Sequence, residues 1–195
     1  APHEMRTRRA RHGAVRDAAR RCDANRASSR HPLAAMTPTG ANVKLGLVID
    51  LDTCVGCHAC ATACKEWNGA SAISGPLADY DPYGAEPSGV WFNRVRHYEV
   101  GAHPDSKTIN FPMSCLHCEE AACVSVCPTG ASYKRSDGIV LVDQDKCMGC
   151  NLCAWACPYG ARELDQCSGT MKKCTLCVDR IYDERLPEDE RQPAC

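Results

Sequence analysis

The sequence has little of three features: aromatic side chains, long apolar runs and recognisable catalytic motifs. Aromatic residues make up 6% of the 195 residues, so a conventional hydrophobic core would be thin. No run approaches the roughly 18 consecutive apolar residues of a membrane-spanning helix, so we expect contact with a membrane only through a partner. The sequence also has no glycine-rich nucleotide loop and no nucleophile paired with a base. We therefore expect no active site within this chain.

Lysine is absent from residues 1–35, which contain nine arginines and three acidic residues. This stretch carries +6 and the remaining residues carry −7, for a total of −1. Arginine-rich, acid-poor leaders occur in transit peptides and twin-arginine signals, but no apolar stretch follows either arginine pair, and we reject export. We expect residues 1–42 to be a basic leader that is disordered or not native, with Met36 as a candidate start. An RNA-binding arm is the remaining alternative.

Cysteine, in contrast, is abundant: 15 of the 17 cysteines fall into four tight motifs. The first and third motifs have the C-x2-C-x2-C-x3-C spacing of bacterial two-cluster ferredoxins. The second motif has a longer middle gap, and the fourth is a pair followed by a cysteine at the chain end. The predicted ligands are Cys54, Cys57, Cys60 and Cys64; Cys115, Cys118, Cys123 and Cys127; Cys147, Cys150, Cys153 and Cys157; Cys174, Cys177 and Cys195.

This spacing predicts 4Fe–4S clusters with crossed ligation. Three cysteines spaced by two residues can bind three irons of one cube, whereas the fourth ligates the other cluster of the pair. Four cubes need sixteen thiolates and the motifs supply 15, so we expect the chain to be a fragment whose missing ligand follows Cys195. Cys22 and Cys167 are left over, and we expect incidental thiols at both positions.

Two other uses of cysteine are less consistent with the sequence. Structural zinc takes four ligands, usually from two separated pairs, and these motifs over-supply it. A disulfide framework belongs to small secreted domains, and no secretory signal is visible.

An internal repeat with an offset of 93 residues relates Asp50–Cys57 to Asp143–Cys150. A short β-type run precedes each copy, at residues 47–49 and 139–142. Asp137 and Gly138 predict a two-residue turn in a hairpin over residues 132–142. We therefore predict an α+β fold with two ferredoxin-like double-cluster units, related by a pseudo-twofold axis and interrupted by a β-hairpin insertion.

The expected domain boundaries follow the pairing of the motifs. Motifs two and three form one unit over residues 112–166, and motifs one and four form the other over residues 43–68 plus 167–195. Residues 69–111 are the insertion, with a loop up to residue 89 and then an alternating strand. The insertion is either a partner-docking surface or a surface hairpin without a role.

Several residues near the motifs have weaker interpretations. Trp155 is expected to pack against a cluster without a redox role. Lys172 and Lys173 could raise the potential of the adjacent cube, although we expect ordinary solvated lysines. Three histidines are expected to be surface or hydrogen-bonding residues rather than iron ligands: His58, His97 and His117.

The four motifs in this order resemble the iron–sulfur subunits of the dimethyl-sulfoxide-reductase family of molybdopterin oxidoreductases, over about residues 43–195. Several segments are similar to the iron–sulfur subunit of the cytoplasmic, quinone-linked sulfite dehydrogenase. These segments are residues 57–60, 64–68, 75–84, 114–120, 127–135 and 171–180. Polysulfide, tetrathionate and dimethyl sulfoxide reductase subunits share the ligand pattern. Ala122 departs from the proline usual in the family.

The resemblance implies a non-catalytic electron-transfer subunit with four 4Fe–4S clusters. It would connect a molybdopterin catalytic subunit with a quinone-reactive membrane subunit, on the cytoplasmic face of the membrane, in sulfite oxidation. The implied ligand sets are Cys54, Cys57 and Cys60 with the missing cysteine; Cys64, Cys174, Cys177 and Cys195; Cys115, Cys118, Cys123 and Cys157; Cys127, Cys147, Cys150 and Cys153.

Two other function classes remain as alternatives. One is a free-standing polyferredoxin, which the long insertion argues against. The other is a cysteine-rich zinc or nucleic-acid module, which the acidic main body argues against because phosphate binding needs a basic surface.

Overall fold

The structure is a computed structural model that describes residues 44–70, 74, 77, 79–81 and 88–195. The predicted leader over residues 1–42 lies outside the described residues, as does most of the predicted loop before residue 89. The helices are α2 (Ala59–Ala70), α3 (Ala122–Ser125), α4 (Leu152–Trp155), α5 (Val178–Ile181) and the 3-10 helix η2 (Glu188–Glu190). Only α2 exceeds one turn among the helices of the described residues.

The strands form four separate antiparallel pairs rather than one sheet. The pairs are β1 (Asp79–Asp81) with β2 (Ser88–Gly89), β3 (Asn93–Val100) with β4 (Lys107–Ser114), β5 (Ser132–Lys134) with β6 (Val140–Val142), and β7 (Glu163–Asp165) with β8 (Thr170–Lys172). The mixture of short helices and strands agrees with the predicted α+β class. The pseudo-twofold relation between two units stays a prediction.

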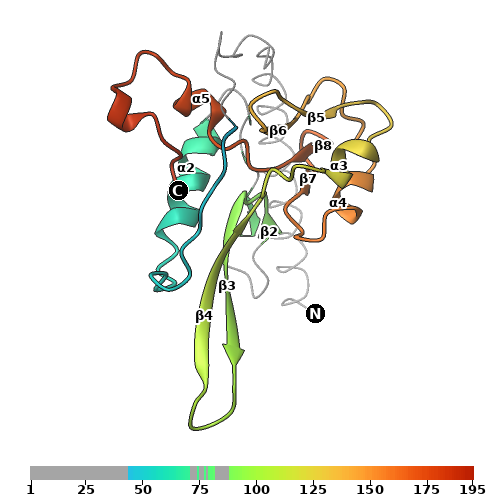
Figure 1. Cartoon of the computed structure of the whole chain (residues 1–195). Helices are drawn as coiled ribbons and strands as arrows, with labels where there is room; N and C mark the ends of the chain where they lie inside the picture. Colours follow the sequence, from blue (N-terminus) through green and yellow to red (C-terminus); the bar gives the residue numbers. More distant parts are fainter. Residues whose placement is uncertain (1–43, 71–73, 75–76, 78, 82–87) are drawn as a thin grey trace, which may run out of the picture.

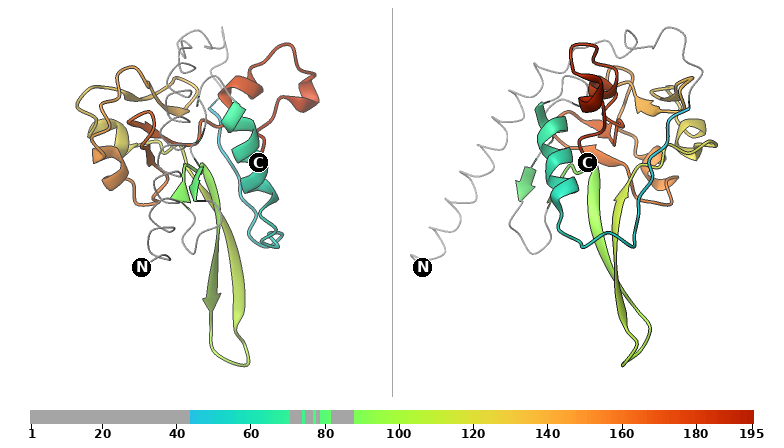
Figure 2. Two further views of the ribbon diagram at one scale, coloured as in Figure 1. Left: turned by 180° about the vertical axis from the view of Figure 1, so that it is seen from behind. Right: turned by 60° about the vertical axis from the view of Figure 1, so that its left-hand side comes forward.

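The elements form a body from which one long hairpin projects. In Figure 1, α2 and α5 lie on one side of the body and α3 and α4 on the other. The two further views in Figure 2 keep this arrangement, and in them the C-terminus lies beside α2. The β3–β4 hairpin extends away from both groups of helices. Its second strand continues to Ser114, so it leads directly into the second cysteine motif at Cys115.

The predicted hairpin over residues 132–142 is confirmed, but its turn is longer than expected. Arg135 N donates to Ile139 O at 2.9 Å, and Gly138 N donates to Arg135 O at 3.1 Å. Three residues therefore lie between the hydrogen-bonded residues Arg135 and Ile139, and Gly138 takes the left-handed conformation with φ of 86°. A type I turn followed by a left-handed residue is a common three-residue hairpin connection. The prediction of a two-residue turn was wrong because Asp-Gly fits both turn types.

Asp137 of this turn links the hairpin to the chain after α5. Its buried carboxylate forms an ion pair with Arg135 at 2.9 Å and accepts hydrogen bonds from Ile139 N at 3.1 Å and Tyr182 Oη at 2.9 Å. The turn thus anchors a segment that is 45 residues away in sequence.

The β-type run predicted at residues 47–49 is not a strand. Residues 44–50 have no regular secondary structure, and Leu45 N makes one backbone hydrogen bond, to Asp137 O at 3.0 Å. Without a partner strand to continue the ladder, these residues instead pack Leu45 and Leu47 against buried Ile139 and Leu141. The corresponding run at 139–142 does form β6.

The β7–β8 hairpin crosses the expected boundary between residues 166 and 167, with Leu164 opposite Met171. The hydrophobic core likewise consists of small clusters that do not follow the two predicted ferredoxin-like units. One cluster combines Cys64, Cys115 and Cys174 with Leu77, Val90 and Phe92. Three cysteine motifs therefore contribute to the same packed interior.

The helices of the described residues are all too short, or too polar, to cross a lipid bilayer.

Candidate metal centre

Each cysteine motif contains a backbone turn of unusual hand immediately before its second cysteine. The residues at this position are Gly56, His117, Gly149 and Leu176, with φ values of 72°, 47°, 69° and 54°. A non-glycine residue in this conformation costs roughly 1–2 kcal/mol, so His117 and Leu176 are held there by the surrounding fold. Successive backbone N–H groups in such turns form concave anion sites, including iron–sulfur sites. The shared turn therefore fits a cluster that carries negative charge.

The left-handed conformation continues on the far side of the second cysteine in motifs one and three. His58 and Asn151 follow Cys57 and Cys150 with φ of 62° and 63°. After this turn the chain enters α2 or α4, which carries the third cysteine. The repeat of motif one in motif three therefore extends to backbone conformation.

One cavity joins cysteines from two different motifs. Its lining residues include Cys127 of the second motif together with Cys147, Cys150 and Cys153 of the third. About 300 Å³ of space, which includes open solvent, lies among its lining residues. The other lining residues are Thr129, Ala131, Ser132, Val142, Met148, Asn151, Arg162 and Met171. This is the set of four cysteines that crossed ligation predicts for one cube.

Backbone amides point at the sulfur atoms that line this cavity. Ser132 N lies 3.4 Å from Cys127 Sγ, and Met171 N lies 3.3 Å from Cys147 Sγ. Hydrogen bonds to cluster sulfurs raise reduction potentials. Desolvation acts to raise the pKa of Cys127, but the hydrogen bonds from Ser132, Thr129 and Ala131 outweigh it and lower the pKa. These hydrogen bonds therefore favour the thiolate form of Cys127.

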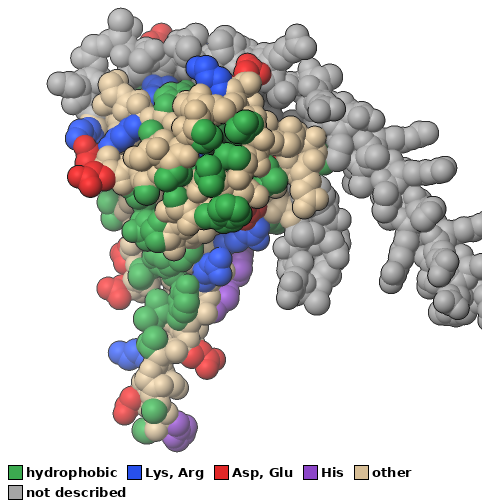
Figure 3. Space-filling view, turned by 90° about the vertical axis from the view of Figure 1, so that its right-hand side faces the viewer, with side chains coloured by type: hydrophobic (Ala, Val, Ile, Leu, Met, Phe, Trp, Pro, Cys, Tyr) green, Lys and Arg blue, Asp and Glu red, His purple; other side chains and the backbone are tan. Residues whose placement is uncertain are grey.

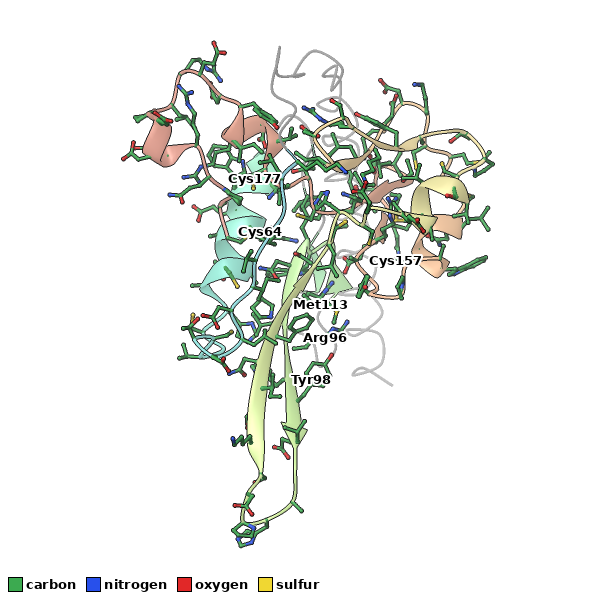
Figure 4. The ribbon with its side chains drawn as sticks, in the orientation of Figure 1. Cys64, Arg96, Tyr98, Met113, Cys157 and Cys177 are labelled. Atoms are coloured by element: carbon green, nitrogen blue, oxygen red, sulfur yellow. The ribbon has the colours of Figure 1, made fainter. Side chains whose placement is uncertain are left out.

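A second group of cysteines lies against α2. Figure 4 shows Cys64 and Cys177 together on this side of the molecule, with Cys157 on the other. The Asn68 side-chain amide lies between two sulfurs, with Nδ2 3.6 Å from Cys64 Sγ and 3.9 Å from Cys177 Sγ. The charges of Cys174, Cys195 and Cys177 also act on Cys64. The structure thus brings together the four cysteines that the resemblance assigns to one cube.

Burial opposes ionisation of these thiols in the metal-free chain. Desolvation, followed by repulsion from the neighbouring cysteines, raises the pKa of Cys64. Burial also raises the pKa of Cys174 to about 12. Iron binds thiolate rather than thiol, so cluster binding must release these protons, and its free energy contributes to folding.

The other two predicted ligand sets are less well defined. Cys115 is buried and lies beside Lys173, and Cys123 accepts a hydrogen bond from Arg162 at 3.0 Å. No described contact joins Cys118 with Cys157. The sets that contain Cys54, Cys57 and Cys60, or Cys115, Cys118, Cys123 and Cys157, stay predictions.

Within the described ranges, no three His, Cys, Asp or Glu side chains are placed to share one metal ion. A cube differs from a single ion because each of its four irons takes its own outward thiolate. Its cysteines surround a volume and do not converge on a point.

Among the buried polar atoms without a hydrogen-bond partner in the described part of the chain, two belong to His117 and Arg162. His117 Nδ1 accepts a hydrogen bond from Val140 N at 3.0 Å, while Nε2 has no partner in the described part of the chain. Burial, and then the charges of Lys173 and Arg162, lower the pKa of His117 to about 2, so its ring is neutral. Arg162 Nη1 is also buried without a described partner. Unsatisfied donors of this kind are rare in a folded interior and fit an anionic cofactor.

The histidines near the first motif form hydrogen bonds, as expected. His58 Nε2 lies 3.2 Å from His97 Nε2, and His97 Nδ1 lies 2.6 Å from Asn110 Oδ1. Asn110 Nδ2 donates to the Cys54 carbonyl at 3.1 Å. These contacts attach the β3–β4 hairpin to the first cysteine loop.

Three of the weaker expectations were wrong. Lys172 and Lys173 are each 3% exposed rather than solvated. Lys172 is the last residue of β8 and Lys173 follows it, and their Nζ atoms donate to the carbonyls of Ser74 and Val140 in the interior. Trp155 is 77% exposed rather than packed on a cluster. It lies two residues after buried Cys153 on α4 and therefore points to the opposite face of the helix.

The leftover cysteine Cys167 is disulfide-bonded rather than an incidental thiol. A disulfide joins residues that are close in space, so spacing along the sequence cannot identify it. Cys22 lies outside the described residues. All 15 motif cysteines are free thiols.

Sequence reasoning also missed functional side chains that belong to no cysteine motif. Asn68 lies one helical turn after Cys64, and this i, i+4 spacing on a helix could have indicated it. Arg162 contacts Cys123 from 39 residues away, and no local pattern indicates such a contact.

Comparison with known proteins places these observations in a family. The sequence model of a 4Fe-4S dicluster domain matches residues 106–195, and that of a 4Fe-4S binding domain matches residues 45–66. The B subunit of the sulfite dehydrogenase of Allochromatium vinosum is 63% identical over 153 residues, which cover 78% of this chain and 63% of that protein.

More distant relatives extend the match to reductases. The B component of the anaerobic dimethyl sulfoxide reductase of Escherichia coli is 39% identical over 145 residues, or 73% of this chain and 65% of that protein. The B subunit of the tetrathionate reductase of Salmonella typhimurium is 35% identical over 146 residues, or 74% of this chain and 52% of that protein. The chain thus spans less than two thirds of the length of these relatives. It is an iron–sulfur protein with 4Fe–4S domains, homologous to the B subunit of sulfite dehydrogenase and to the B component of dimethyl sulfoxide reductase.

Proposed function

We propose that this chain is the electron-transfer subunit of an oxidoreductase complex, between a molybdopterin catalytic subunit and a quinone-reactive membrane subunit. It would hold four 4Fe–4S clusters, one of which needs a ligand beyond the 15 motif cysteines. The clusters, when bound, supply one-electron redox chemistry. The chain itself contributes thiolates, amide donors to sulfur, and a partly buried setting.

One observation carries this proposal: the cavity where Cys127 meets the first three cysteines of the third motif. Crossed ligation of this kind ties two sequence motifs into one double-cluster unit. Two clusters held in one unit suit electron transfer, and no separate substrate site is needed for that role.

We infer that the complex oxidises sulfite. The relative named as a sulfite dehydrogenase subunit is 63% identical, against 39% and 35% for those named as components of dimethyl sulfoxide and tetrathionate reductases. The same electron-transfer role in one of these reductases is the second candidate. In either case we propose that the chain is peripheral, on the cytoplasmic face of the membrane, and held there by its partner.

Reduction of the clusters by substrate tests this proposal. Sulfite is added anaerobically to the oxidised, purified complex, and reduced-cluster signals are followed by electron paramagnetic resonance. We expect sulfite alone to reduce the clusters. Clusters that sulfite does not reduce, but that dimethyl sulfoxide or tetrathionate reoxidises after reduction with dithionite, would favour the second candidate. A chain that purifies without a molybdenum subunit would instead be a free-standing polyferredoxin.

We further propose that the β3–β4 hairpin binds another subunit of the complex. Opposite residues of the ladder point to the same face, and one face pairs Arg96 with Phe111 and Tyr98 with Ile109. Figure 4 shows Arg96, Tyr98 and Met113 along the hairpin. Tyr98 is 44% exposed and Ile109 is 37% exposed. In Figure 3, hydrophobic side chains continue from the body onto the hairpin.

The base of this face is a cleft next to a predicted ligand. Its lining includes Arg94, Arg96 and Met113 of the hairpin and Tyr159, which lies two residues after Cys157. Tyr, Met and Arg are enriched in protein interfaces. The arrangement suits a partner with an apolar surface and an acidic group opposite Arg96.

A matched pair of hairpin variants tests the docking proposal. Tyr98→Ala should weaken association with the other subunits by about 30-fold, which corresponds to a hot-spot loss of roughly 2 kcal/mol. Glu99→Ala changes the adjacent residue on the other face and should leave association unchanged. Equal effects of the two variants, with iron content preserved, would refute a docking role for this face.

A further inference from the structure

Arg162 is a buried cation that lies outside the four cysteine motifs. It is 5% exposed. Its Nη2 donates to Cys123 Sγ at 3.0 Å and to Ser132 Oγ at 2.7 Å. Its Nη1 is buried and finds no partner among the described residues. A guanidinium cannot lose its proton in a protein, so an isolated buried charge would be costly without an anion nearby.

Arg162 faces two sets of cysteines. Through Nη2 it contacts Cys123, which belongs to the second motif. It also lines the cavity formed by Cys127, Cys147, Cys150 and Cys153. Cys153 and Arg162 line this cavity together. The guanidinium therefore lies between the proposed ligands of two different clusters.

We propose that Arg162 raises the reduction potentials of two neighbouring clusters at once, the one bound through Cys123 and the one bound through Cys153. Net charge, hydrogen bonds to sulfur and burial set the potential of an iron–sulfur cluster. A reduced cluster carries one more negative charge, which a nearby cation stabilises, and weak screening in the interior strengthens that effect. The proposal rests on the proposed function for the presence of clusters at these cysteines.

Two other cations near these cysteines, Lys173 and Lys146, do not have the same position. Lys173 lies beside Cys115 and Cys174, but a buried lysine can lose its proton, whereas an arginine keeps its charge. Lys146 precedes Cys147, but its side chain is 64% exposed and paired with Asp143 at 3.1 Å. Water screens such an exposed charge. Arg162 alone among these three combines a permanent charge with contact to one cysteine set and a place in the cavity of another.

Potentiometric titration of the cluster-loaded complex, followed by electron paramagnetic resonance, tests this inference. In Arg162→Gln, we expect two of the cluster potentials to become more negative together while the others stay unchanged. Lys146→Gln also removes one positive charge beside the third motif, and should move no potential. A shift of one cluster potential only would overturn the proposal, because Arg162 would then act as a local hydrogen-bond donor. Unchanged potentials would also overturn it.

Arg162→Lys keeps the test decisive if Arg162→Gln does not retain its clusters. Lysine preserves the charge but has no planar fork to contact Cys123 and Ser132 together. We therefore expect both potentials to stay near those of the unmodified protein or to fall slightly together, and a change at one cluster only, or an upward shift, would overturn the proposal. Iron and sulfide analysis of the unmodified protein reports separately on whether clusters are present. A failure of the proposed function would therefore be distinguishable from a failure of this inference.

Discussion

Cys127 lies three residues beyond Val124 of α3 and belongs to the second motif in sequence, but its sulfur lines a cavity of the third motif. The turn after α3 carries it there, where Cys127 N donates to Val124 O at 3.2 Å and Gly130 N donates to Cys127 O at 3.3 Å. The amides of Ser132 and Ala131 and the Thr129 hydroxyl then favour its thiolate form. A single side chain thus connects two motifs that are otherwise separate in sequence.

Replacing this cysteine tests the crossed arrangement. In Cys127→Ser, we expect the cluster bound by Cys147, Cys150 and Cys153 to be lost or damaged, because serine is a much poorer iron ligand than thiolate. Those three thiols should then become open to alkylation, which mass spectrometry detects.

The reciprocal variant provides the control. Cys157→Ser should expose Cys115, Cys118 and Cys123 more than Cys147, Cys150 and Cys153. If Cys127→Ser exposed Cys115, Cys118 and Cys123 instead, each motif would bind its own cluster and the crossed arrangement would be wrong.

Individual residues also show where sequence reasoning ends. The 15 candidate ligands follow from spacing, because a cube needs thiolates at short, fixed separations along a loop. The environment of Lys172 and Lys173 does not follow from spacing. Two adjacent lysines normally indicate solvent, and only the packing of β8 inside the body places both in the interior. Arg162 and Trp155 show the same limit, since burial of a side chain is decided by elements far away in sequence.

At the scale of elements, the cysteine loops depend on close contact with neighbouring turns. Gly149 has φ of 69°, and a Cβ atom there would clash with the carbonyl oxygen of Gly169 in the β7–β8 turn. Gly160 has a similar φ of 59°, but a Cβ atom there would meet nothing within 4 Å. The two glycines therefore separate the cost of backbone conformation from the cost of a clash.

Alanine at these two positions should give unequal losses of stability. Gly160→Ala should cost about 1 kcal/mol for the left-handed backbone, whereas Gly149→Ala should cost roughly 2–4 kcal/mol because the rigid carbonyl must also move. The measurement is the urea concentration at which cluster absorbance is lost. Equal losses for the two variants would show that the loop does not depend on its contact with the β7–β8 turn.

Elements were predicted best where a local signal sufficed. Alternation along residues 90–100 indicated a strand, and β3 occupies residues 93–100. The run at residues 47–49 carried the same kind of signal, yet it forms no strand because a strand needs a partner edge. The long β3–β4 hairpin is confirmed as an element, whereas its role in binding stays a proposal.

At the scale of the whole molecule, the proposed clusters supply what the low aromatic content does not. The packed interior is divided into small groups of apolar side chains. Two of these groups contain predicted ligands, among them Cys64, Cys115 and Cys153. Folding and cluster binding should therefore be coupled. The two sides of the molecule share the β7–β8 hairpin and the contact between Asp137 and Tyr182, so damage to one proposed unit should loosen the other.

The coupling of the two sides can be measured directly. Tyr182→Phe removes the hydroxyl that donates to the buried Asp137 carboxylate at 2.9 Å. We expect a loss of about 1–3 kcal/mol in stability, since a hydrogen bond to a charged group is broken. Tyr98→Phe removes a hydroxyl from the exposed hairpin and should have no effect on stability. An equally small effect of Tyr182→Phe would mean that this contact does not tie the two sides together.

Analysis of iron, acid-labile sulfide and zinc in the anaerobically purified or reconstituted protein tests the central claim most directly. The account predicts a brown protein that contains iron and labile sulfide in equal amounts, because every 4Fe–4S cube contributes four of each. Stoichiometric zinc with no labile sulfide would contradict it, since the same cysteines would then form zinc sites and the chain could not transfer electrons.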